Sequence, residues 1–515
     1  MNDVVANGEL PEGWVATTMG AVAAVVGGGT PKTAIADNFS DAPGHPWLTP
    51  ADLTGYTRKH VSGGLRFLSD KGLARSSAKY MRAGTILFSS RAPIGYVAIA
   101  SNPITTNQGF RSFVPTEALD SEFAYYYLKA ITPLAEQLAS GTTFNELSGS
   151  KAKVLPLLLP PIEEQRRIAE RLDEIEVRRA STACHLDDAR GITVRLRRAV
   201  LAAACSGRLT ADWRVDHPGS TSEKLVTRLT EERAPSTGHR KSTQNGHGLT
   251  SETQLALLPD TWSLVPLGDI IDVGTGATPL RKNRDYYEDG TIPWVTSGAV
   301  NAGRITTPTE LITQLAVDET NVKVFPPGTL LVAMYGEGQT RGRVAELAIE
   351  AGTNQAVAAV LFDAETARLQ PFIRLFFEDS YQRVRARSIG GVQPNLNLGM
   401  IKATLIPLPS LDEQHEIVRR ADTMLATAER LTTQIEDVES TLERVGRGSL
   451  AKAFRGDLVP TEAALAEDGS REFESAEQLL ARIAKRTVPD AKQDRKRAPT
   501  GRGAKSSARE ISTDG

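Results

Sequence analysis

Residues 159–165, LPPIEEQ, recur 249 positions further along the chain as residues 408–414, LPSLDEQ. In both places a proline-rich strand end is followed by acidic residues, and a long run with Arg or Lys toward its end comes next. Acids in the first turn and bases near the last suit the helix macrodipole. We therefore expect each stretch to open a long helix, so that the chain carries the same helix twice.

Both long runs carry a heptad pattern, in which apolar or small residues step alternately by four and three from Ile168 to Val200 and from Ile417 to Ser449. A coiled coil needs this spacing. Each helix alone could pack on its own domain, but the matched lengths favour two helices packed antiparallel about an internal pseudo-two-fold. The predicted coiled-coil interface comprises Ile168, Leu172, Ile175, Leu186, Leu196, Ile417, Met424, Leu431, Ile435, Val438 and Leu442.

Each long helix is expected to close at a glycine, Gly207 or Gly456. From about Ile162 to Ser206, the first helix is about 65 Å long at 1.5 Å per residue. A shorter echo follows each helix, since residues 223–228 resemble residues 477–482. This echo predicts a small amphipathic helix after each long one.

The repeat extends upstream of the helices as short motifs in the same order. LPEGW at 10–14 matches LPDTW at 258–262, and Thr-Pro, Pro-Trp, Gly-Thr and Thr-Asn-Gln motifs follow in both copies. The offset between copies drifts between 244 and 248 here, whereas it stays at 249 beyond Gly141 and Gly390. We infer two copies of one domain with loops of different length, and such loops are where binding differences usually lie.

The fold class is α+β, because short strands (85–89 and 329–334) occur with turn-rich loops and one helix per copy (123–139 and 371–384). The residues from about 487 to 515 are polar and lack apolar periodicity, so we expect them to be disordered. The expected segments are a first domain (1–157), a first long helix (158–213), a short helix and linker (214–257), a second domain (258–406), a second long helix (407–459), and a short helix with a basic tail (460–515).

The composition is that of an ordinary globular protein, with 515 residues, 40% of them hydrophobic and 24% charged. No secretory signal pattern opens the chain, and no run of about eighteen apolar residues occurs. The two cysteines, Cys184 and Cys205, fall within one predicted helix and suggest no disulfide. We expect a cytoplasmic protein without membrane contact.

The motifs of the common catalytic and cofactor sites do not occur. The stretch from Gly27 to Thr30 lacks the Gly-Lys-Ser/Thr end of a P-loop, and Cys184-His185 has no second ligand pair at zinc spacing. No Ser-His-Asp constellation repeats, and the Asp-Pro-Pro-Tyr type tetrapeptide of adenine methyltransferases does not occur. The sequence therefore favours a binding function over catalysis.

The formal net charge of −2 does not indicate a nucleic-acid binder, but residues 58–91 contain many bases against the single acid Asp70. Arg and Lys suit phosphates, and Arg, Asn and Gln suit base edges. A solvated polar surface is the alternative for each residue, and a motif present in both copies, such as Thr-Asn-Gln, fits a scaffold role. The candidates are Arg58, Lys59, Arg66, Lys71, Arg75, Lys79, Arg82, Arg91, Thr142, Thr143 and Asn145 in the first copy, and Arg281, Lys282, Arg284, Arg304, Gln339, Arg341, Arg343, Gln393, Asn395 and Asn397 in the second.

The doubled order of these motifs, from Leu10 to about Arg486, resembles the specificity subunit of type I restriction-modification enzymes. The resemblance implies two target-recognition domains, each reading one half of a bipartite asymmetric DNA site, with an antiparallel coiled coil as a ruler between them. The second copy departs from the family at 391–394, Gly-Val-Gln-Pro, where the first copy has the more usual Gly-Thr-Thr-Phe at 141–144.

The same resemblance implies that this chain is not catalytic and binds no cofactor or metal itself. Two methyltransferase subunits would supply S-adenosylmethionine chemistry on adenine, and restriction/translocase subunits would supply ATP- and Mg-dependent cleavage. Partner subunits would also neutralise many of the DNA phosphates, which accounts for the low net charge of this chain.

Two other functions remain open from the sequence alone. A coiled-coil scaffold whose paired domains bind protein or glycan fits the near-neutral charge. A self-sufficient nuclease or methyltransferase needs catalytic motifs that the sequence lacks.

Overall fold

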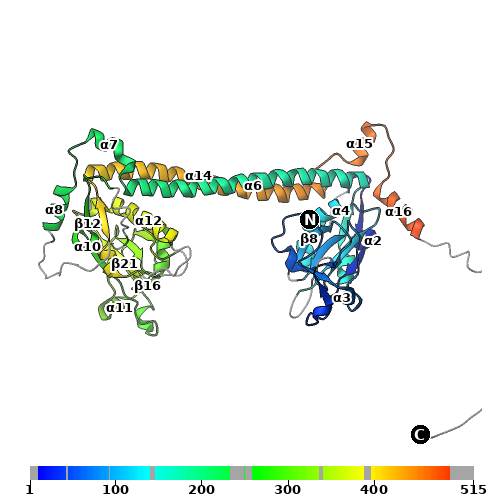
Figure 1. The fold of residues 1–515 in the computed structure, drawn as a ribbon, viewed down its shortest axis with the longest axis horizontal. Coiled ribbons are helices and arrows are strands. Elements are labelled where there is room, and N and C mark those ends of the chain that lie inside the picture. Colours follow the sequence, from blue (N-terminus) through cyan, green and yellow to red (C-terminus); the bar gives the residue numbers. More distant parts are fainter. Residues whose placement is uncertain are drawn as a thin grey trace, which may run out of the picture. The chain divides into compact units, whose positions relative to one another are not determined.

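The computed structural model describes residues 10–41, 44–91, 93–139, 145–231, 233, 249, 258–335, 340–387 and 396–487. The predicted linker at 234–248 and the tail beyond 487 lie outside these residues. The chain divides into two compact units, one made of residues 1–184 with 439–515 and the other of residues 185–438 (Figure 1). Each unit thus contains one globular domain and part of both long helices.

The first unit holds a five-stranded sheet of order β2-β10-β7-β8-β5, a four-stranded sheet of order β3-β6-β4-β9, and the pair β1-β11. Its strands are β1 (Val15–Thr18), β2 (Ala23–Gly27), β3 (Phe39–Ser40), β4 (His45–Leu48), β5 (His60–Val61), β6 (Arg66–Leu68), β7 (Ile86–Ser90), β8 (Ile94–Ala100), β9 (Thr105–Thr106), β10 (Arg111–Pro115) and β11 (Pro156–Leu159). Its globular helices are α2 (Met19–Val22), α3 (Asp70–Ala74), α4 (Ser121–Leu138), α5 (Gly149–Lys153) and the 3-10 helices η1 (Ala36–Asn38) and η2 (Pro50–Leu53).

The second unit repeats the five-stranded sheet as β13-β21-β18-β19-β15 and the strand pair as β12-β22. Its four-stranded sheet, β16-β14-β20-β17, keeps three strands of the first and differs in the fourth, because β17 pairs with β20 where the first unit has β3 beside β6. Its strands are β12 (Ser263–Pro266), β13 (Asp272–Thr275), β14 (Ile292–Val295), β15 (Arg304–Ile305), β16 (Glu310–Ile312), β17 (Val324–Phe325), β18 (Leu330–Ala333), β19 (Val344–Leu347), β20 (Ala351–Thr353), β21 (Val357–Leu361) and β22 (Leu405–Leu408). Its globular helices are α10 (Leu267–Ile270), α11 (Gln314–Glu319), α12 (Gln370–Arg387), α13 (Leu398–Lys402), and the 3-10 helices η4 (Arg284–Tyr286), η5 (Ser297–Ala302) and η6 (Ala367–Leu369).

The core of each domain lies between its five-stranded sheet and one helix. In the first domain α4 begins at Asp120, whose carboxylate accepts hydrogen bonds from the backbone N–H groups of Glu122 and Phe123, as an N-cap does. From Phe123 to Leu128, α4 is buried all round, and the helix packs on β8. In the second domain α12 fills the same place. The predicted α+β class is confirmed.

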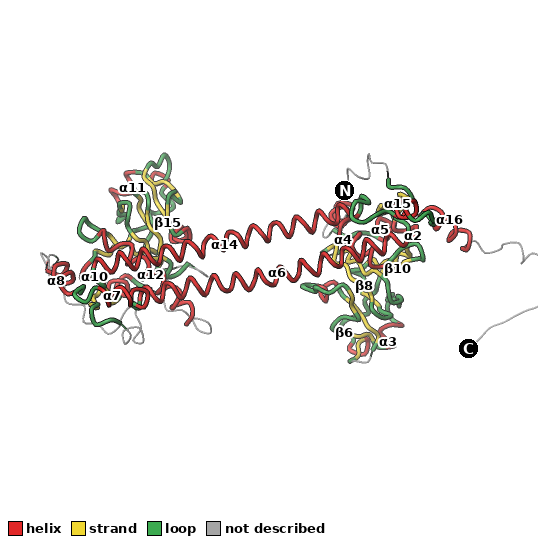
Figure 2. The backbone as a smooth tube through the Cα atoms, turned by 90° about the horizontal axis from the view of Figure 1, so that it is seen from above, coloured by secondary structure: helices red, strands yellow, loops and turns green. Residues whose placement is uncertain are grey.

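The two long helices are α6 (Ile162–Cys205) and α14 (Leu411–Ala453), close to the predicted bounds. In the first unit Leu172 of α6 shares a core with Ala453 of α14, and in the second unit Val200 shares a core with Ala421. The start of each helix therefore lies beside the end of the other, as Figure 2 shows within each unit. The antiparallel pairing of the two helices is confirmed.

The seam between the helices differs in detail from the predicted interface. Leu425, Ala428 and Ile435 of α14 are buried, and Leu425 also packs into the core of the second domain. The seam positions of α14 step by four and three through Ala421, Leu425, Ala428, Thr432, Ile435, Glu439, Leu442 and Gly446. The seam therefore keeps the heptad spacing but uses the residue after each of Met424, Leu431 and Val438. Among the predicted residues, Ile168, Leu172, Ile417 and Ile435 are buried and Ile175, Leu186 and Leu442 are partly exposed. Leu196, Met424, Leu431 and Val438, which the heptad pattern placed in the interface, are instead 36%, 44%, 40% and 41% exposed, respectively.

Short helices follow each long helix and pack on the domain of the other copy. After α6 come η3 (Arg208–Thr210), α7 (Ala211–Asp216) and α8 (Glu223–Glu231), and Leu229 of α8 lies in the core of the second domain. After α14 come α15 (Glu462–Asp468) and α16 (Ala476–Thr487), and Leu479 of α16 lies in the core of the first domain. Within the described part of the chain, no helix is both long and apolar enough to cross a bilayer.

Candidate nucleic-acid interface

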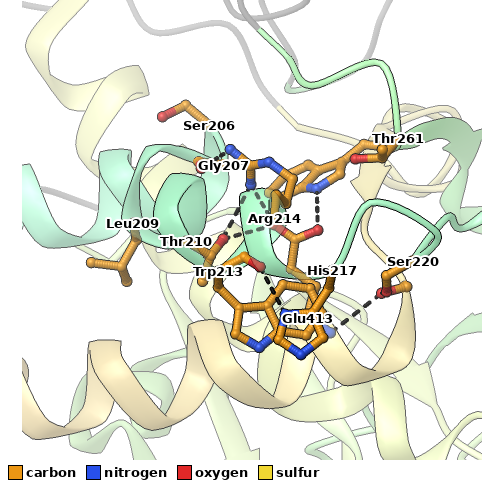
Figure 3. Close-up of polar contacts among 12 residues, drawn as sticks. Ser206, Gly207, Leu209, Thr210, Trp213, Arg214, His217, Ser220, Thr261 and Glu413 are labelled. Carbon is orange, nitrogen blue, oxygen red and sulfur yellow. Dashed lines mark hydrogen bonds and ion pairs between the residues drawn. The ribbon is translucent and has the colours of Figure 1, made fainter.

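A buried carboxylate ties the second domain to the long helices (Figure 3). Glu413, in the first turn of α14, is fully buried and accepts a 2.9 Å hydrogen bond from the indole Nε1 of Trp262. Its other oxygen accepts bonds from the hydroxyl of Thr210, at 2.7 Å, and from the guanidinium of Arg214. Both of these partners follow the end of α6. The LPDTW motif therefore joins the start of one long helix to the end of the other.

The first unit repeats this junction with different partners. Trp14 Nε1 donates to Glu164 Oε1 at 2.9 Å, and the backbone N–H of Glu462 donates to Glu164 Oε2 at 2.8 Å. Burial raises the pKa of the Glu164 carboxyl, although these two bonds oppose the shift. Arg167 forms a 2.6 Å ion pair with Glu462. The LPEGW and EEQ motifs are therefore part of the scaffold in both units.

The Thr-Asn-Gln motifs also hold the scaffold. Asn107 accepts a 2.8 Å bond from the N–H of Gly109, and Asn354 accepts a 3.2 Å bond from the N–H of Ala356. The glutamines, Gln108 and Gln355, accept bonds from the hydroxyls of the Thr-Pro turns, Thr30 and Thr278. The same contacts in two domains with different loops favour the scaffold role for this motif.

Three of the basic candidates in the first domain are held by the domain itself. Lys59 pairs with Glu122 at 2.7 Å and with Asp173; burial lowers its pKa, but these two carboxylates outweigh burial and raise it. Arg82 donates to the carbonyl of Pro115. Arg91 lies 3.8 Å from Glu146. Among these three, Lys59 in particular has the geometry of a structural ion pair rather than of a DNA contact.

The other basic candidates are exposed, and most surround α3 and the strand before it. Arg66 lies on β6, Lys71 on α3, where it pairs with Asp37 at 3.1 Å, and Arg75 and Lys79 follow α3. Figures 1 and 2 both show α3 at the end of this unit away from the long helices. We call this part, built on the four-stranded sheet and α3, the first distal lobe. Arg58 is exposed outside it, before β5.

The matching part of the second domain, built on β16-β14-β20-β17 and α11, is the second distal lobe. Its candidate bases Arg281, Lys282 and Arg284 come before β14, whereas the candidate bases of the first lobe come after β4. Arg281 pairs with Glu310 and lines an open recess of about 620 Å³ together with Arg284, Tyr287 and Leu311. The two lobes therefore present bases from different segments of a common fold.

The remaining candidates of the second domain lie apart from this lobe. Arg304 is 67% exposed and lies 3.8 Å from Glu346. Arg343 donates to the hydroxyl of Tyr381 at 3.2 Å, and Arg341 is near it in sequence and partly exposed. Asn397 is the N-cap of α13 and accepts a 2.9 Å bond from the N–H of Met400, so its oxygen has a structural partner.

Asn145 is exposed in the first domain. Thr142, Thr143, Gln339, Gln393 and Asn395 lie outside the described residues. Sequence reasoning missed Phe39, Tyr287 and Glu310, which contact arginines of the lobes. An aromatic residue at similar spacing before each Pro-Trp motif is the signal that could have found the first two. Among the described residues, no His, Cys, Asp and Glu side chains gather into a group that could hold a metal ion.

Comparison with known proteins identifies the family. The model of the type I restriction modification DNA specificity domain matches residues 11–182 and again 259–440. The chain is 30% identical over 339 residues to the type I restriction enzyme MjaIX specificity subunit of Methanocaldococcus jannaschii. The aligned residues cover 65% of this chain and 69% of that one. The chain is also 24% identical over 460 residues to the EcoBI specificity subunit of Escherichia coli, which covers 87% of each chain.

Two solved structures share the fold. A chain from a structure on complex assembly and conformational transition of the type I R-M system superposes with a TM-score of 0.60 at 20% identity, over 88% of this chain and 100% of the other. The crystal structure of the HsdS subunit from Thermoanaerobacter tengcongensis gives a TM-score of 0.51 at 19% identity, over 88% of this chain and 99% of the other.

Two like α+β domains, each packed on a shared antiparallel helix pair, define a class of tandem-repeat proteins. Within that class, this chain belongs to the type I restriction-modification DNA specificity family. It is the non-catalytic DNA specificity subunit of such a system.

Proposed function

We propose that this subunit directs its complex to a bipartite, asymmetric DNA target, with one half-site read by each domain. The observation that carries the proposal is the contrast between a repeated scaffold and unlike lobes. Trp47 and Trp294 donate to the carbonyls of Gly29 and Ala277 in the same way, at 3.0 Å and 3.2 Å. The arginines of the two lobes nevertheless come from different segments, Arg66 and Arg75 after β4 in the first and Arg281 and Arg284 before β14 in the second, so the two domains offer different side chains to DNA.

The two long helices serve as the ruler between the half-sites in this proposal. Rigid helices fix a distance, because each residue adds 1.5 Å. Both helices run without a break, α6 through Gly191 included. A fixed distance between domains translates into a fixed number of unread base pairs between the half-sites.

Methylation and cleavage belong to partner subunits in this proposal. Two methyltransferase subunits would bring S-adenosylmethionine, and restriction/translocase subunits would bring ATP and Mg, all in the cytoplasm beside the DNA. The half-exposed apolar side chains of Met424, Leu431 and Val438 recur every seven residues along one side of α14 and suit a protein partner on the helices.

Exchange of residues 10–157 for the corresponding domain of another family member tests the assignment of one domain to one half-site. Methylated adenines are mapped across the genome with the parent and the chimeric subunit, each expressed with the partner subunits. One half-site should change while the other half-site and the gap stay as they were. A motif changed in both halves, or in neither, would contradict the proposal.

A further inference from the structure

Arg66 of the first distal lobe is stacked on an aromatic ring. Its guanidinium carbon lies 3.6 Å from the centroid of the Phe39 ring. Phe39 in turn contacts Trp47 edge to face, with ring centroids 5.9 Å apart and planes at 60°. Trp47 belongs to the Pro-Trp motif that both copies share. The arginine is thus supported by a platform built on the common scaffold.

Arg281 of the second distal lobe is stacked on a matching platform. Its guanidinium carbon lies 4.9 Å from the Tyr287 centroid and 5.3 Å from the centroid of Trp294, the Trp of the second Pro-Trp motif. Phe39 and Tyr287 hold the same place in the two copies, because each directly follows a 3-10 helix, η1 or η4, and precedes the strand that carries the motif Trp.

The two arginines reach these platforms from positions that are not equivalent. In the first lobe, Arg66 on β6 lies opposite Trp47 on β4. In the second lobe the residue opposite Trp294 is Glu310, which has the opposite charge and binds Arg281. Arg66 and Glu310 thus hold equivalent positions in the two copies. If Arg66 only stabilised the fold, an acid at this position in the second copy would not require an arginine from another segment. The second domain instead places a guanidinium on the equivalent ring from another segment.

Both guanidinium groups are accessible to a ligand. Arg66 is exposed, and the side chain of Arg281 is 52% exposed at the edge of the 620 Å³ recess. Glu310 accepts a bond from Nη1 of Arg281, which leaves other N–H donors of that fork available. A planar fork held on a ring presents two parallel donors in a fixed direction, and guanine offers O6 and N7 as the matching acceptor pair in the major groove.

We propose that Arg66 and Arg281 are guanine-reading side chains, one in each half-site, and that Glu310 is a positioning residue for Arg281. This inference rests on the proposed function of the two domains. It adds that the domains read a base with the same chemical group on the same platform, although that group comes from different places in the two sequences.

The test uses the full-length subunit expressed with its partner subunits and the map of methylated adenines as the readout. Arg66→Ala should relax one guanine position of one half-site, with discrimination at that position falling about 5- to 150-fold. Arg281→Ala should do the same in the other half-site only. Each variant is the matched control for the other, since a general loss of folding or affinity would affect both half-sites together.

Lysine substitutions separate base reading from a phosphate contact or a fold contribution. Arg66→Lys and Arg281→Lys keep the positive charge and the contact with the ring, but they lack the planar fork. They should relax the same positions as the alanine variants. Glu310→Gln should relax only the position that Arg281 reads, because a neutral amide would not hold the guanidinium by charge.

Three results would overturn the inference: a parent motif kept by both Arg66→Ala and Arg281→Ala, both half-sites weakened equally by either variant, or full rescue by lysine. In each of these cases the parent subunit still yields a bipartite motif, so the proposed function stands. A parent subunit that yields no motif dependent on this chain would refute the proposed function itself.

Discussion

The indole N–H of Trp262 donates a 2.9 Å hydrogen bond to the buried carboxylate of Glu413, 151 residues away in sequence. Trp14 and Glu164 repeat this relationship at a separation of 150 residues. Each bond joins the residue directly before the first strand of a domain to the first turn of the long helix that follows the domain. These junctions account for the recurrence of the Leu-Pro-x-x-Trp and Glu-Gln motifs in the sequence.

Trp262→Phe should destabilise the second unit by about 1–3 kcal/mol, because it removes a donor from a fully buried carboxylate while keeping most of the ring. Chemical denaturation of the full-length protein checks this through the midpoint of the affected transition. Trp213→Phe is the matched control, since Trp213 on α7 is only partly buried and stacks on His217. Equal shifts of the denaturation midpoint for the two variants would show that the hydrogen bond between Trp262 and Glu413 does not add to stability.

Gly207→Ala should weaken the junction at the end of α6. Gly207 has a φ of 75°, and a Cβ there would lie 2.5 Å from the side chain of Pro259. Left-handed backbone costs a non-glycine residue about 1 kcal/mol or more before any clash. We expect a lower thermal unfolding midpoint for this variant and little change for Gly219→Ala, where an added Cβ would meet no atom within 4 Å. If Gly207→Ala left the unfolding midpoint unchanged, the loop that contains Pro259 would have to shift without loss of stability.

Acid should destabilise the second unit through Asp363. Hydrogen bonds from the backbone and hydroxyl of Thr366, together with Arg233, outweigh the effect of burial and lower the pKa of Asp363 to about 2. A carboxyl whose pKa is lower in the folded state stabilises the fold above the unfolded value of 3.8, and this contribution is lost as the pH falls toward 2. Because the side chain is 55% exposed, the contribution is about 1 kcal/mol.

Denaturation of Asp363→Asn at several pH values checks this effect. The variant should be less stable than the parent at pH 7, and the two should converge between pH 4 and pH 2. Asp260→Asn, at an exposed position before β12, is the control and should follow the parent throughout. If the difference in unfolding free energy between Asp363→Asn and the parent stayed constant down to pH 2, the loss of stability in acid would not come from this carboxyl.

Insertion of one heptad into both long helices should lengthen the gap of the target and leave both half-sites intact. Suitable positions lie between Arg179 and Arg197 in α6 and between Glu429 and Leu442 in α14, because Arg179 bonds the carbonyl of Leu442 and Arg197 pairs with Glu429. Seven residues add about 10 Å, or about three base pairs of DNA. Methylation mapping would show the longer gap, and an unchanged gap would rule out the ruler.

The sequence predicted the long helices well because their signals are local and repeated. The start of α6 at Ile162 follows from the prolines and acids around it, and Gly207 has the positive φ that the helix end predicts. The seam of α14 was predicted wrongly at Met424, which is exposed, whereas Leu425 is buried. Both residues fit an apolar face, and only packing in the folded protein decides between them.

The binding candidates were harder to predict, because long-range partners decide which bases are exposed. Lys59 stands in a basic stretch of sequence, yet Asp173, 114 residues later, holds it in an ion pair. The sequence around Asn397 indicates a helix N-cap rather than a base contact, because an Asn before an apolar run commonly caps a helix. The platform under Arg66 needed both β4 and β6 to be in place before it became visible.

Phe454, near the end of α14, packs against Phe123 and Tyr127 with ring centroids 5.6 Å and 4.9 Å apart. Synthesis on the ribosome proceeds from the N-terminus, so the first domain emerges well before the segment that completes its core. The second unit, by contrast, is continuous in sequence from 185 to 438. A segment made after the second unit therefore closes the first domain, and a nascent or truncated subunit that lacks this segment would expose the aromatic surface of α4.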